Sequence, residues 1–254
     1  MCLLAFYFHG LAEAPILAAA NREEFFDRPT LPPRLVALEN SSGQALCGLD
    51  ARAGGTWLGV NRYGVLVAVT NRRKADLPPS PRSRGRLCLD LLAYPTAEEA
   101  ARRAMAELST GRYAGANYVC LDGRQGSVIH AGDRLECAPL GPGLHLLSNG
   151  DLDDPHDARL KLARELFTAR PIGSIAGFLT AAKRVCGHYV PQGGSGGPSI
   201  VLRASDRGTV SSTLVALAAR AADSVYQYAP GPPDVAPYDD YSPLVRSLCS
   251  DSRE

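Results

Sequence analysis

Cys2 is the residue whose type and position offer the most chemistry. Removal of Met1, which is favoured when the second side chain is small, would leave a thiol and a free α-amine on one residue. An α-amine has an unperturbed pKa of ~7.7–8.0, so near neutral pH it can accept the proton of a thiol whose own pKa is ~8.5. Such a residue can attack a carbonyl carbon without a separate base. The alternative is a small apolar residue on a core strand, and a retained Met1 would block the amine.

Polar residues end the second predicted strand, where a hairpin would return the chain to the neighbourhood of Cys2. They are Asn21, Arg22, Glu23 and Glu24. A carboxylate there could orient the amine, and Arg22 could anchor an anion or pair with a neighbouring glutamate. The alternative is a strand end that runs into a solvated, charged turn. We take Asn21 and Glu23 as candidate catalytic residues and Arg22 as a candidate ligand-binding residue.

Two asparagines, Asn71 and Asn149, follow strands predicted over residues 65–70 and 144–148. A side-chain amide at a strand end can donate to the oxyanion that develops during acyl transfer. Asn is also a common turn residue, so each position has a purely structural alternative. These two asparagines complete the candidate catalytic set.

A glycine-rich turn, Gly54-Gly55-Thr56-Trp57, contains the only tryptophan of the chain. Two glycines permit a positive φ and a close approach of the backbone to a neighbour or a ligand. Trp57 offers a large apolar face. The structural interpretation is a tight turn into a strand with Trp57 in the core. The functional interpretation makes these four residues one wall of an apolar ligand pocket beside Cys2.

The loop over residues 72–86 is strongly basic. Its charged residues are Arg72, Arg73, Lys74, Arg82, Arg84 and Arg86 against Asp76. A solvated loop is the ordinary interpretation, and a site for an anionic ligand such as a pyrophosphate or a propionate is the functional one. We take Arg72 and Arg73 as candidate ligand-binding residues. The glycines of residues 193–197 lack a following Lys and predict a flexible linker instead of a phosphate-binding loop.

Composition and charge exclude several classes of protein. The 254 residues are 45% apolar and 21% charged, values that exclude a disordered chain and a coiled coil. The net charge of +1 lacks the basic field that nucleic-acid binders usually carry, so we expect no nucleic-acid partner. No apolar run reaches the ~20 residues of a membrane-spanning helix, so we expect no transmembrane anchor. The sequence sets no oligomeric state.

The cysteines and histidines predict neither a metal site nor a disulfide framework. The seven cysteines include no C-x-x-C pair, and the five histidines lack metal-ligand spacing. Free thiols in a reducing cytoplasm are the expectation. The apolar residues 3–8 and the small residues 18–20 resemble parts of a cleaved signal. No Lys or Arg precedes them, and Glu13 and Pro15 interrupt the run, so we expect a cytoplasmic protein.

Hydrophobic periodicity predicts groups of strands that alternate with pairs of helices. Strands are expected over residues 1–8, 15–21, 44–49, 56–60, 65–70, 117–122, 127–131, 144–148, 199–203, 209–217 and 224–228. Helices are expected over residues 87–92, from a capping box of Thr96 and Glu99 to Leu108, from Pro155 through Phe167, and over residues 172–186. Pro29, Pro32 and Pro33 predict a loop. This order indicates a layered α+β domain whose helices cover antiparallel sheets.

We assign residues 1–229 to a single domain, a size that suits one large folding unit. From residue 230 onward Pro, Asp and Ser dominate. We therefore expect the tail, residues 230–254, to be poorly ordered.

Several motifs occur together in a fixed order: Met1-Cys2, Ala20-Asn21-Arg22-Glu23-Glu24, Arg28-Pro29-Thr30, Ala53-Gly54-Gly55-Thr56-Trp57-Leu58-Gly59, Asn71-Arg72, Ser83-Arg84-Gly85, Leu147-Ser148-Asn149 and Gly208-Thr209. In these motifs the chain resembles the NRDE family, also called the transport and Golgi organisation family, over nearly its whole length. The resemblance implies a four-layer αββα sandwich of the N-terminal-nucleophile-hydrolase type. That fold agrees with the predicted order of elements.

A fainter resemblance connects the chain to cysteine hydrolases of that fold, such as penicillin V acylase and bile salt hydrolase. Their pattern implies that Cys2 is the nucleophile. It also implies that Asn21 and Glu23 match the Asn and the Asp of a Gly-Arg-Asn-x-Asp strand end. Asn71 and Asn149 match two later asparagines that help to form the oxyanion site.

Three departures separate this chain from those patterns. Ala20 stands where the hydrolases have Arg, and Val210 stands where the NRDE family has Arg. Glu23 replaces an Asp, which keeps the carboxylate but extends it by one methylene. The lost positive charges would have lowered the thiol pKa or held an anionic substrate.

Two functions from different classes follow. One is a hydrolase, an amidase or a thioesterase, in which Cys2 attacks the carbonyl while Asn71 and Asn149 stabilise the oxyanion. The other is a binding protein, because the resemblance implies a link to haem trafficking and to lipid or acyl-CoA homeostasis. Its cleft would hold a small amphipathic anion, apolar near Trp57 and anionic near the basic loop. Haem or an acyl-CoA would be cargo, and no cofactor would be required. The three departures favour binding.

Overall fold

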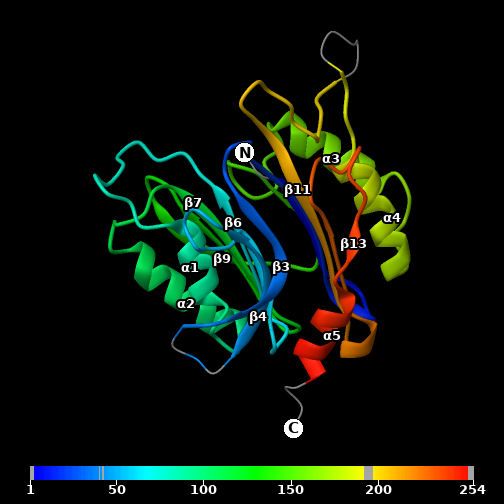
Figure 1. The fold of residues 1–254 in the computed structure, drawn as a ribbon, viewed down its shortest axis with the longest axis horizontal. Coiled ribbons are helices and arrows are strands. Elements are labelled where there is room, and N and C mark those ends of the chain that lie inside the picture. The colour runs from blue at the N-terminus through cyan, green and yellow to red at the C-terminus, as the bar shows by residue number, and fades with distance from the viewer. Residues whose placement is uncertain (1–2, 40, 42, 192–196, 251–254) are drawn as a thin grey trace.

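The chain folds into four layers, in which two antiparallel sheets face each other and a pair of helices covers each outer side (Figure 1). The computed structural model describes residues 3–39, 41, 43–191 and 197–250. Cys2, the predicted nucleophile, therefore lies outside the described residues. The expected α+β fold, a four-layer αββα sandwich, is confirmed.

The first sheet has six strands in the order β10-β1-β2-β11-β12-β13. Their bounds are β1 Leu3–Leu11, β2 Ala14–Phe25, β10 Gly143–Leu147, β11 Arg207–Leu217, β12 Val225–Ala229 and β13 Asp239–Asp240. The predicted N-terminal hairpin is β1 with β2. Its register pairs Leu3 with Asn21, while Leu4 pairs with Leu147 of β10 on the other side. The start of β1, the end of β2 and the end of β10 therefore lie side by side at the same end of the sheet.

The second sheet has seven strands in sequence order, from β3 to β9. Their bounds are β3 Thr30–Ala37, β4 Gln44–Asp50, β5 Leu58–Asn61, β6 Leu66–Asn71, β7 Ala116–Leu121, β8 Gly126–Ala131 and β9 Leu135–Pro139. Each strand pairs antiparallel with the next along the chain. This meander leaves β3 as one edge of the sheet and β9 as the other.

Two helix pairs cover the sheets. Helices α1 (Arg84–Leu91) and α2 (Ala97–Leu108) pack on the second sheet, and α3 (Ala158–Thr168) and α4 (Ile175–Cys186) pack on the first. The capping residue predicted for α2 is confirmed, because the Thr96 hydroxyl accepts from the Glu99 backbone N–H at 3.2 Å. A short 3-10 helix, Ala221–Asp223, precedes β12.

The period-two alternation of β1 and β2 divides their side chains between two cores. Ala18 and Ala20 face the core between the sheets, while Leu17 and Ala19 face the helices α3 and α4. The polar end of β2 continues this pattern, so that Arg22 lies on the inter-sheet face and its neighbours on the helix face.

Three sequence-based expectations for strands are wrong. The residues around Pro29, Pro32 and Pro33 form β3 instead of a loop, and proline is tolerated there because β3 is an edge strand with an irregular register between Leu31 and Arg34. Strand β9 was not predicted. Residues 199–203 form no strand and contribute one isolated bridge, from Arg203 to Gly208.

The expectation for the C-terminal segment is also wrong over residues 230–250. This segment adds β13 to the first sheet and forms helix α5, Ser242–Ser250, which packs on β4, β5 and β12. Val245 and Leu248 are buried in the core between the sheets. The Pro- and Asp-rich composition concealed a short amphipathic helix that closes one end of the sandwich, at the bottom of Figure 1.

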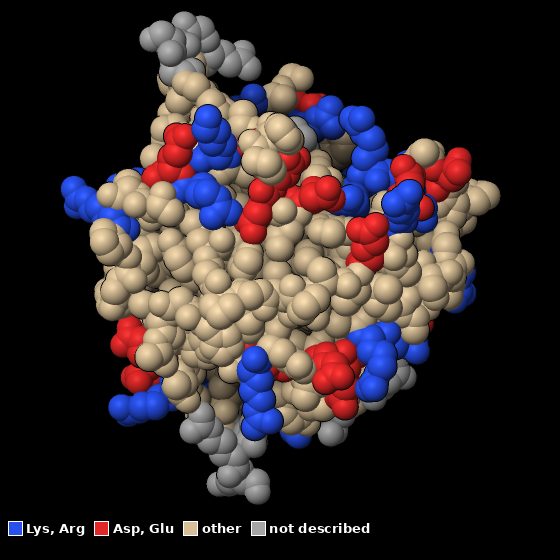
Figure 2. All heavy atoms as spheres, turned by 180° about the vertical axis from the view of Figure 1, so that it is seen from behind, with Lys and Arg blue, Asp and Glu red and all other residues tan. Residues whose placement is uncertain are grey.

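The surface carries charges of both signs. On the face in Figure 2, basic and acidic side chains are interspersed toward the upper and lower margins, with a largely uncharged band between them. Among the described residues, none of the helices has the length and apolar character needed to cross a bilayer.

We predict that α5 contributes to the stability of the whole domain. Leu248→Ala should lower the free energy of unfolding by about 2–3 kcal/mol, because it empties a buried site between the sheets. Ser247→Ala, at an exposed position of the same helix, should change it little. Urea denaturation of both variants checks this. Equal stabilities would mean that α5 does not hold the sandwich together.

Candidate functional site

The two sheets are tied together where β6 and β10 end. The Thr70 hydroxyl donates to the Ser148 carbonyl at 2.6 Å, and the Asn117 side-chain amide donates to the Gly150 carbonyl at 3.1 Å. The residues that follow Thr70 and Ser148 are Asn71 and Asn149. The structure thus brings these two predicted catalytic asparagines to the same end of the sandwich.

Asn21 and Glu23 lie on the helix face of β2. The Asn21 amide donates to the Cys186 carbonyl at the end of α4, at 2.9 Å, while its carboxamide oxygen is buried without a hydrogen-bond partner among the described residues. Glu23 forms an ion pair with Arg159 at 2.6 Å and approaches the Thr209 hydroxyl at 3.5 Å. Both predicted residues are therefore placed against α3 and α4.

Arg159 is a residue of the site that the sequence did not reveal. It stands in the first turn of α3, where a guanidinium N–H also donates to the Ile200 carbonyl at 2.5 Å. Asp157 caps this helix and accepts from the Ser148 hydroxyl at 2.6 Å. The only signal available was the expected start of a helix near Pro155, which does not show what its first turn faces.

Burial dominates the titration of Glu23. It raises the pKa of this carboxyl from 4.5 to about 7, and the attraction of Arg159 offsets only part of the rise. A carboxyl with such a pKa can exchange protons near neutral pH, which suits a group that assists proton transfer. The carboxylate is ionised more easily when a further cation approaches it.

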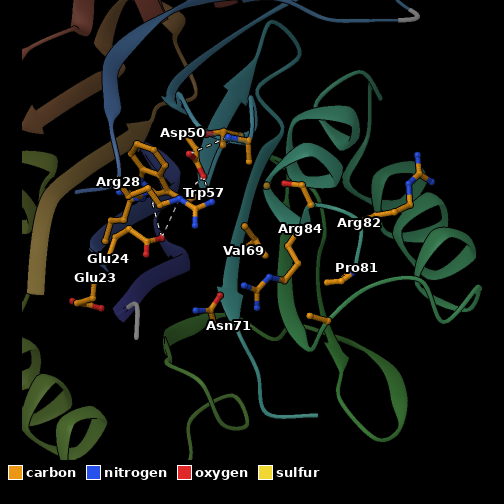
Figure 3. Close-up of a pocket in the computed structure, with 16 residues that line it drawn as sticks. Glu23, Glu24, Arg28, Asp50, Trp57, Val69, Asn71, Pro81, Arg82 and Arg84 are labelled. Atoms are coloured by element: carbon orange, nitrogen blue, oxygen red, sulfur yellow. Dashed lines mark hydrogen bonds and ion pairs between the residues drawn. The ribbon is translucent and has the colours of Figure 1, made fainter. Parts of the chain in front are cut away.

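A cavity of about 290 Å³ opens beside this strand end (Figure 3). Its wall comes from the end of β2, from the turn before β5, from β6 and from the start of α1. The charged lining residues are Arg22, Glu23, Glu24, Arg28, Asp50, Arg82 and Arg84, and the apolar ones include Trp57 and Val69. The cavity therefore combines guanidinium groups with an apolar wall.

Trp57 and Arg22 form one side of the cavity. The Arg22 guanidinium lies over the indole at 4.6 Å from the ring centre, and it donates to the Thr30 hydroxyl at 2.9 Å. The indole packs against Gly48, where a Cβ atom would lie 2.6 Å from the ring. Trp57 thus contacts the inter-sheet core and lines the cavity as well, so both interpretations of this residue describe part of its environment.

Gly54 and Gly55 position the wall and do not line it. Gly54 has a φ of +66°, and a Cβ atom on Gly55 would lie 2.1 Å from the carbonyl carbon of Gly85. The Thr56 N–H donates to the Gly85 carbonyl at 2.9 Å. The positive φ explains Gly54, and close approach to the start of α1 explains Gly55. Thr56 and Gly85 line the cavity as a result.

Some arginines of the basic loop bind other parts of the protein, and others line the cavity. Arg72 is bound to the Gly150 carbonyl at 2.8 Å and to Asp151 at 2.5 Å, and Arg73 is exposed outside the cavity. Arg82 and Arg84 line the cavity instead. Arg82 pairs with Glu107 at 3.1 Å. The two arginines of this loop that we selected as ligand-binding candidates, Arg72 and Arg73, are therefore not among the residues that line the cavity, whereas the third candidate, Arg22, is.

Arg84 lines the cavity, and its positive charge is not balanced by a carboxylate of the described residues. Its guanidinium donates to the Gly115 carbonyl at 2.9 Å, and within the described part of the chain no carboxylate lies within 4.0 Å of it. Arg28 on the opposite side is neutralised by Asp50 at 2.5 Å and by Glu24 at 3.6 Å. Figure 3 shows these two groups on opposite sides of the cavity.

We predict that Glu23 gives the stability of the fold a measurable pH dependence. Between about pH 4.5 and 7 the folded chain binds more protons than the unfolded chain, so the free energy of unfolding falls as the pH rises. Glu23→Gln should remove up to about 3 kcal/mol of this fall, whereas Glu165→Gln, exposed on α3, should keep it. Urea unfolding at several pH values tests this. A wild-type stability that rises relative to Glu23→Gln would show that the ion pair outweighs burial.

Two solved structures share this fold. One is a Caenorhabditis elegans N-acylethanolamine-hydrolyzing acid amidase ortholog, with a TM-score of 0.53 and 14% identity, covering 84% of this chain and 92% of its own. The other is a variant of the conjugated bile acid hydrolase from Clostridium perfringens, with a TM-score of 0.54 and 13% identity, covering 94% and 92%. At these identities the likeness establishes the N-terminal-nucleophile-hydrolase-like fold alone.

Sequence relatives identify the family. The Transport and Golgi organization 2 homolog of Mus musculus is 33% identical over 181 residues, and the homolog of Homo sapiens is 31% identical over 179. Each alignment covers 66% of this chain and 63% of the relative's own length. A family model described as Transport and Golgi organisation 2 matches residues 1–170. The chain therefore belongs to the transport and Golgi organisation 2 family.

Proposed function

We propose that this chain binds a small amphipathic anion in the cavity beside the end of β2. The observation that carries the proposal is Arg84, whose guanidinium lines the cavity without a carboxylate partner among the described residues, facing a wall that contains Trp57. A carboxylate or phosphate group would supply that partner. The apolar part of the ligand would contact Trp57 and Val69.

The start of α1 supports the same polarity. Ser83 caps this helix, and Ser83, Arg84 and Gly85 all line the cavity. A helix N-terminus favours negative charge nearby, which adds to the field of the arginine side chain. On the other side Glu24 and Asp50 hold Arg28, so the excess positive charge belongs to the α1 side.

The volume of the cavity bears on the kind of ligand. About 290 Å³ lies near the lower limit of ~300–1,000 Å³ that is typical of sites for small molecules. A head group with a few methylenes suits this space better than a rigid macrocycle does. We therefore favour a simple acyl or alkyl anion, such as the lipid ligands that the family resemblance suggested, over haem or an intact acyl-CoA.

A second candidate function is hydrolysis with Cys2 as the nucleophile. It is favoured by the carboxamide oxygens of Asn21 and Asn149, which are both buried without hydrogen-bond partners among the described atoms. A buried carboxamide oxygen that the fold does not satisfy can accept from an N–H group of a substrate or from the α-amine of Cys2. In this mechanism the Cys2 sulfur would add to the carbonyl carbon of an amide or thioester. Its α-amine would take the thiol proton and pass it to the leaving amine or thiol as the C–N or C–S bond breaks. A water molecule would then hydrolyse the acyl-Cys2 thioester, releasing the acid and restoring the thiol.

The other residues have defined roles in that mechanism. The side-chain amides of Asn71 and Asn149 would donate to the oxyanion, and Asn21 and Glu23 would orient the chain terminus. The two structures that share the fold are named for hydrolysing N-acylethanolamines and conjugated bile acids. Hydrolysis requires the same acyl site as binding, together with a free amine on Cys2.

Binding is tested with butyl phosphate and the fluorescence of Trp57, the only tryptophan. Butyl phosphate should change this fluorescence saturably, whereas butanol should not. Arg84→Gln should weaken the binding roughly tenfold or more, since it removes a charge-assisted contact, and Arg84→Lys should restore part of it.

Arg102→Gln, exposed on α2, is the matched control and should bind like the wild type. Haem is titrated in parallel through its Soret band. Butyl phosphate binding that is indifferent to Arg84→Gln would contradict the proposed site.

Hydrolysis is tested separately with an N-acyl amide and an acyl thioester. If the second candidate function holds, Cys2→Ala should abolish turnover, whereas Cys137→Ala, which changes an exposed thiol, should leave it unchanged. Intact mass spectrometry shows whether Met1 is absent from the protein used. Turnover that survives Cys2→Ala would contradict a mechanism based on this residue.

A further inference from the structure

An apolar groove lies next to the cavity. It encloses about 440 Å³ and is lined mainly by prolines and large apolar side chains. We call it the proline groove and define it by Phe26, Pro29, Pro32, Val210, Tyr228 and Pro232. Its walls come from the turn after β2, the edge strand β3, the strands β11 and β12, and the segment that follows β12.

The groove and the cavity are direct neighbours. Arg28 lines both of them. Two hydrogen bonds also cross the boundary: Arg22, in the cavity, donates to Thr30 in the groove at 2.9 Å, and Thr209, in the groove, donates to Glu23 in the cavity at 3.5 Å. The cavity and the groove therefore adjoin at Arg28.

The lining changes from charged to apolar across that boundary. Arg28 is the one charged residue among the described residues that line the groove, and its guanidinium is bound by Asp50 and Glu24 on the cavity side. Val210 adds an apolar side chain from a β-bulge, where β11 shifts register against β2 between Thr209 and Ser211. The cavity thus offers charge to a head group, and the groove offers hydrocarbon contact.

The prolines of β3 make a peptide strand a less suitable occupant of the groove than an alkyl chain. Edge strands can pair with an added peptide strand through their free N–H groups. Pro32 and Pro33 of β3 have no N–H, so this stretch cannot donate to an incoming peptide. An alkyl chain makes no such demand, because it needs only apolar surface.

We propose that the proline groove binds the alkyl chain of the anion whose head group occupies the cavity. This inference rests on the proposed binding function and extends it to the class of ligand: a single-chain amphiphile with a carboxylate or phosphate head. The small volume of the cavity requires a longer chain to leave it, and the shared residue Arg28 marks the exit. Val210 and Phe26 then determine the chain length that is bound.

The test compares butyl, octyl and dodecyl phosphate, each below its micellar concentration, by isothermal titration calorimetry. Affinity should rise with chain length in the wild type, by up to roughly fourfold for each methylene that is fully buried. Val210→Asp should abolish this rise and leave the affinity for butyl phosphate nearly unchanged. Val235→Asp, at a position that is 71% exposed and outside the groove, is the matched control and should keep the rise.

A second variant guards against misfolding. Phe26 is 54% exposed, so Phe26→Asp should fold even where Val210→Asp does not, and it should also flatten the dependence on chain length. A rise that persists in the folded groove variants overturns the inference while the head-group site stands. Failure of butyl phosphate to bind the wild type overturns the proposed function itself, and the inference with it.

Discussion

The polar end of β2 is the constraint on which the rest of the structure depends. Asn21, Arg22 and Glu23 are buried in a strand that has neighbours on both sides, so each side chain must find a partner within the protein. Alternation along the strand sends Arg22 to the inter-sheet face and its two neighbours to the helix face. One strand thereby requires a partner for Glu23 from α3, a partner for Asn21 from α4, and a partner for Arg22 from the second sheet.

These requirements connect elements that are far apart in sequence. Arg159, the ion-pair partner of Glu23, lies in helix α3. Asp157, which caps this helix, accepts a hydrogen bond from the Ser148 hydroxyl. The Ser148 carbonyl in turn accepts from Thr70 of the other sheet. Removal of one member of a buried ion pair leaves a desolvated charge, which is much more destabilising than loss of a surface pair. The positions of the candidate catalytic asparagines are therefore fixed by a network of buried polar contacts that spans both sheets.

Sequence patterns predicted what depends on neighbouring residues. The N-terminal hairpin, the Thr96 cap and the close approach at Gly55 follow from local periodicity and local stereochemistry, and the structure has all three. The role of Arg159 was not predicted, because its partner Glu23 is 136 positions away along the chain. The residues in the first turn of a helix do not show what that turn faces. Strand β3 was not predicted, because prolines break a central strand but are tolerated in an edge strand. Only the order of the strands in the sheet shows that β3 is an edge strand.

The strand faces show where an Arg side chain at position 20 would point. Ala20 packs on the inter-sheet face, in the core, and a guanidinium there would have pointed toward the same side as the cavity. Arg22 stands two residues further along this face, one full pleat away, and lies over Trp57 at the cavity wall. Arg22 thus carries a positive charge on the same strand face as position 20, at the cavity wall. Its guanidinium also pairs with Glu24 at 3.5 Å, so the charge of Arg22 is balanced within the cavity wall, and the positive charge that remains to attract an anion is that of Arg84 on the opposite side.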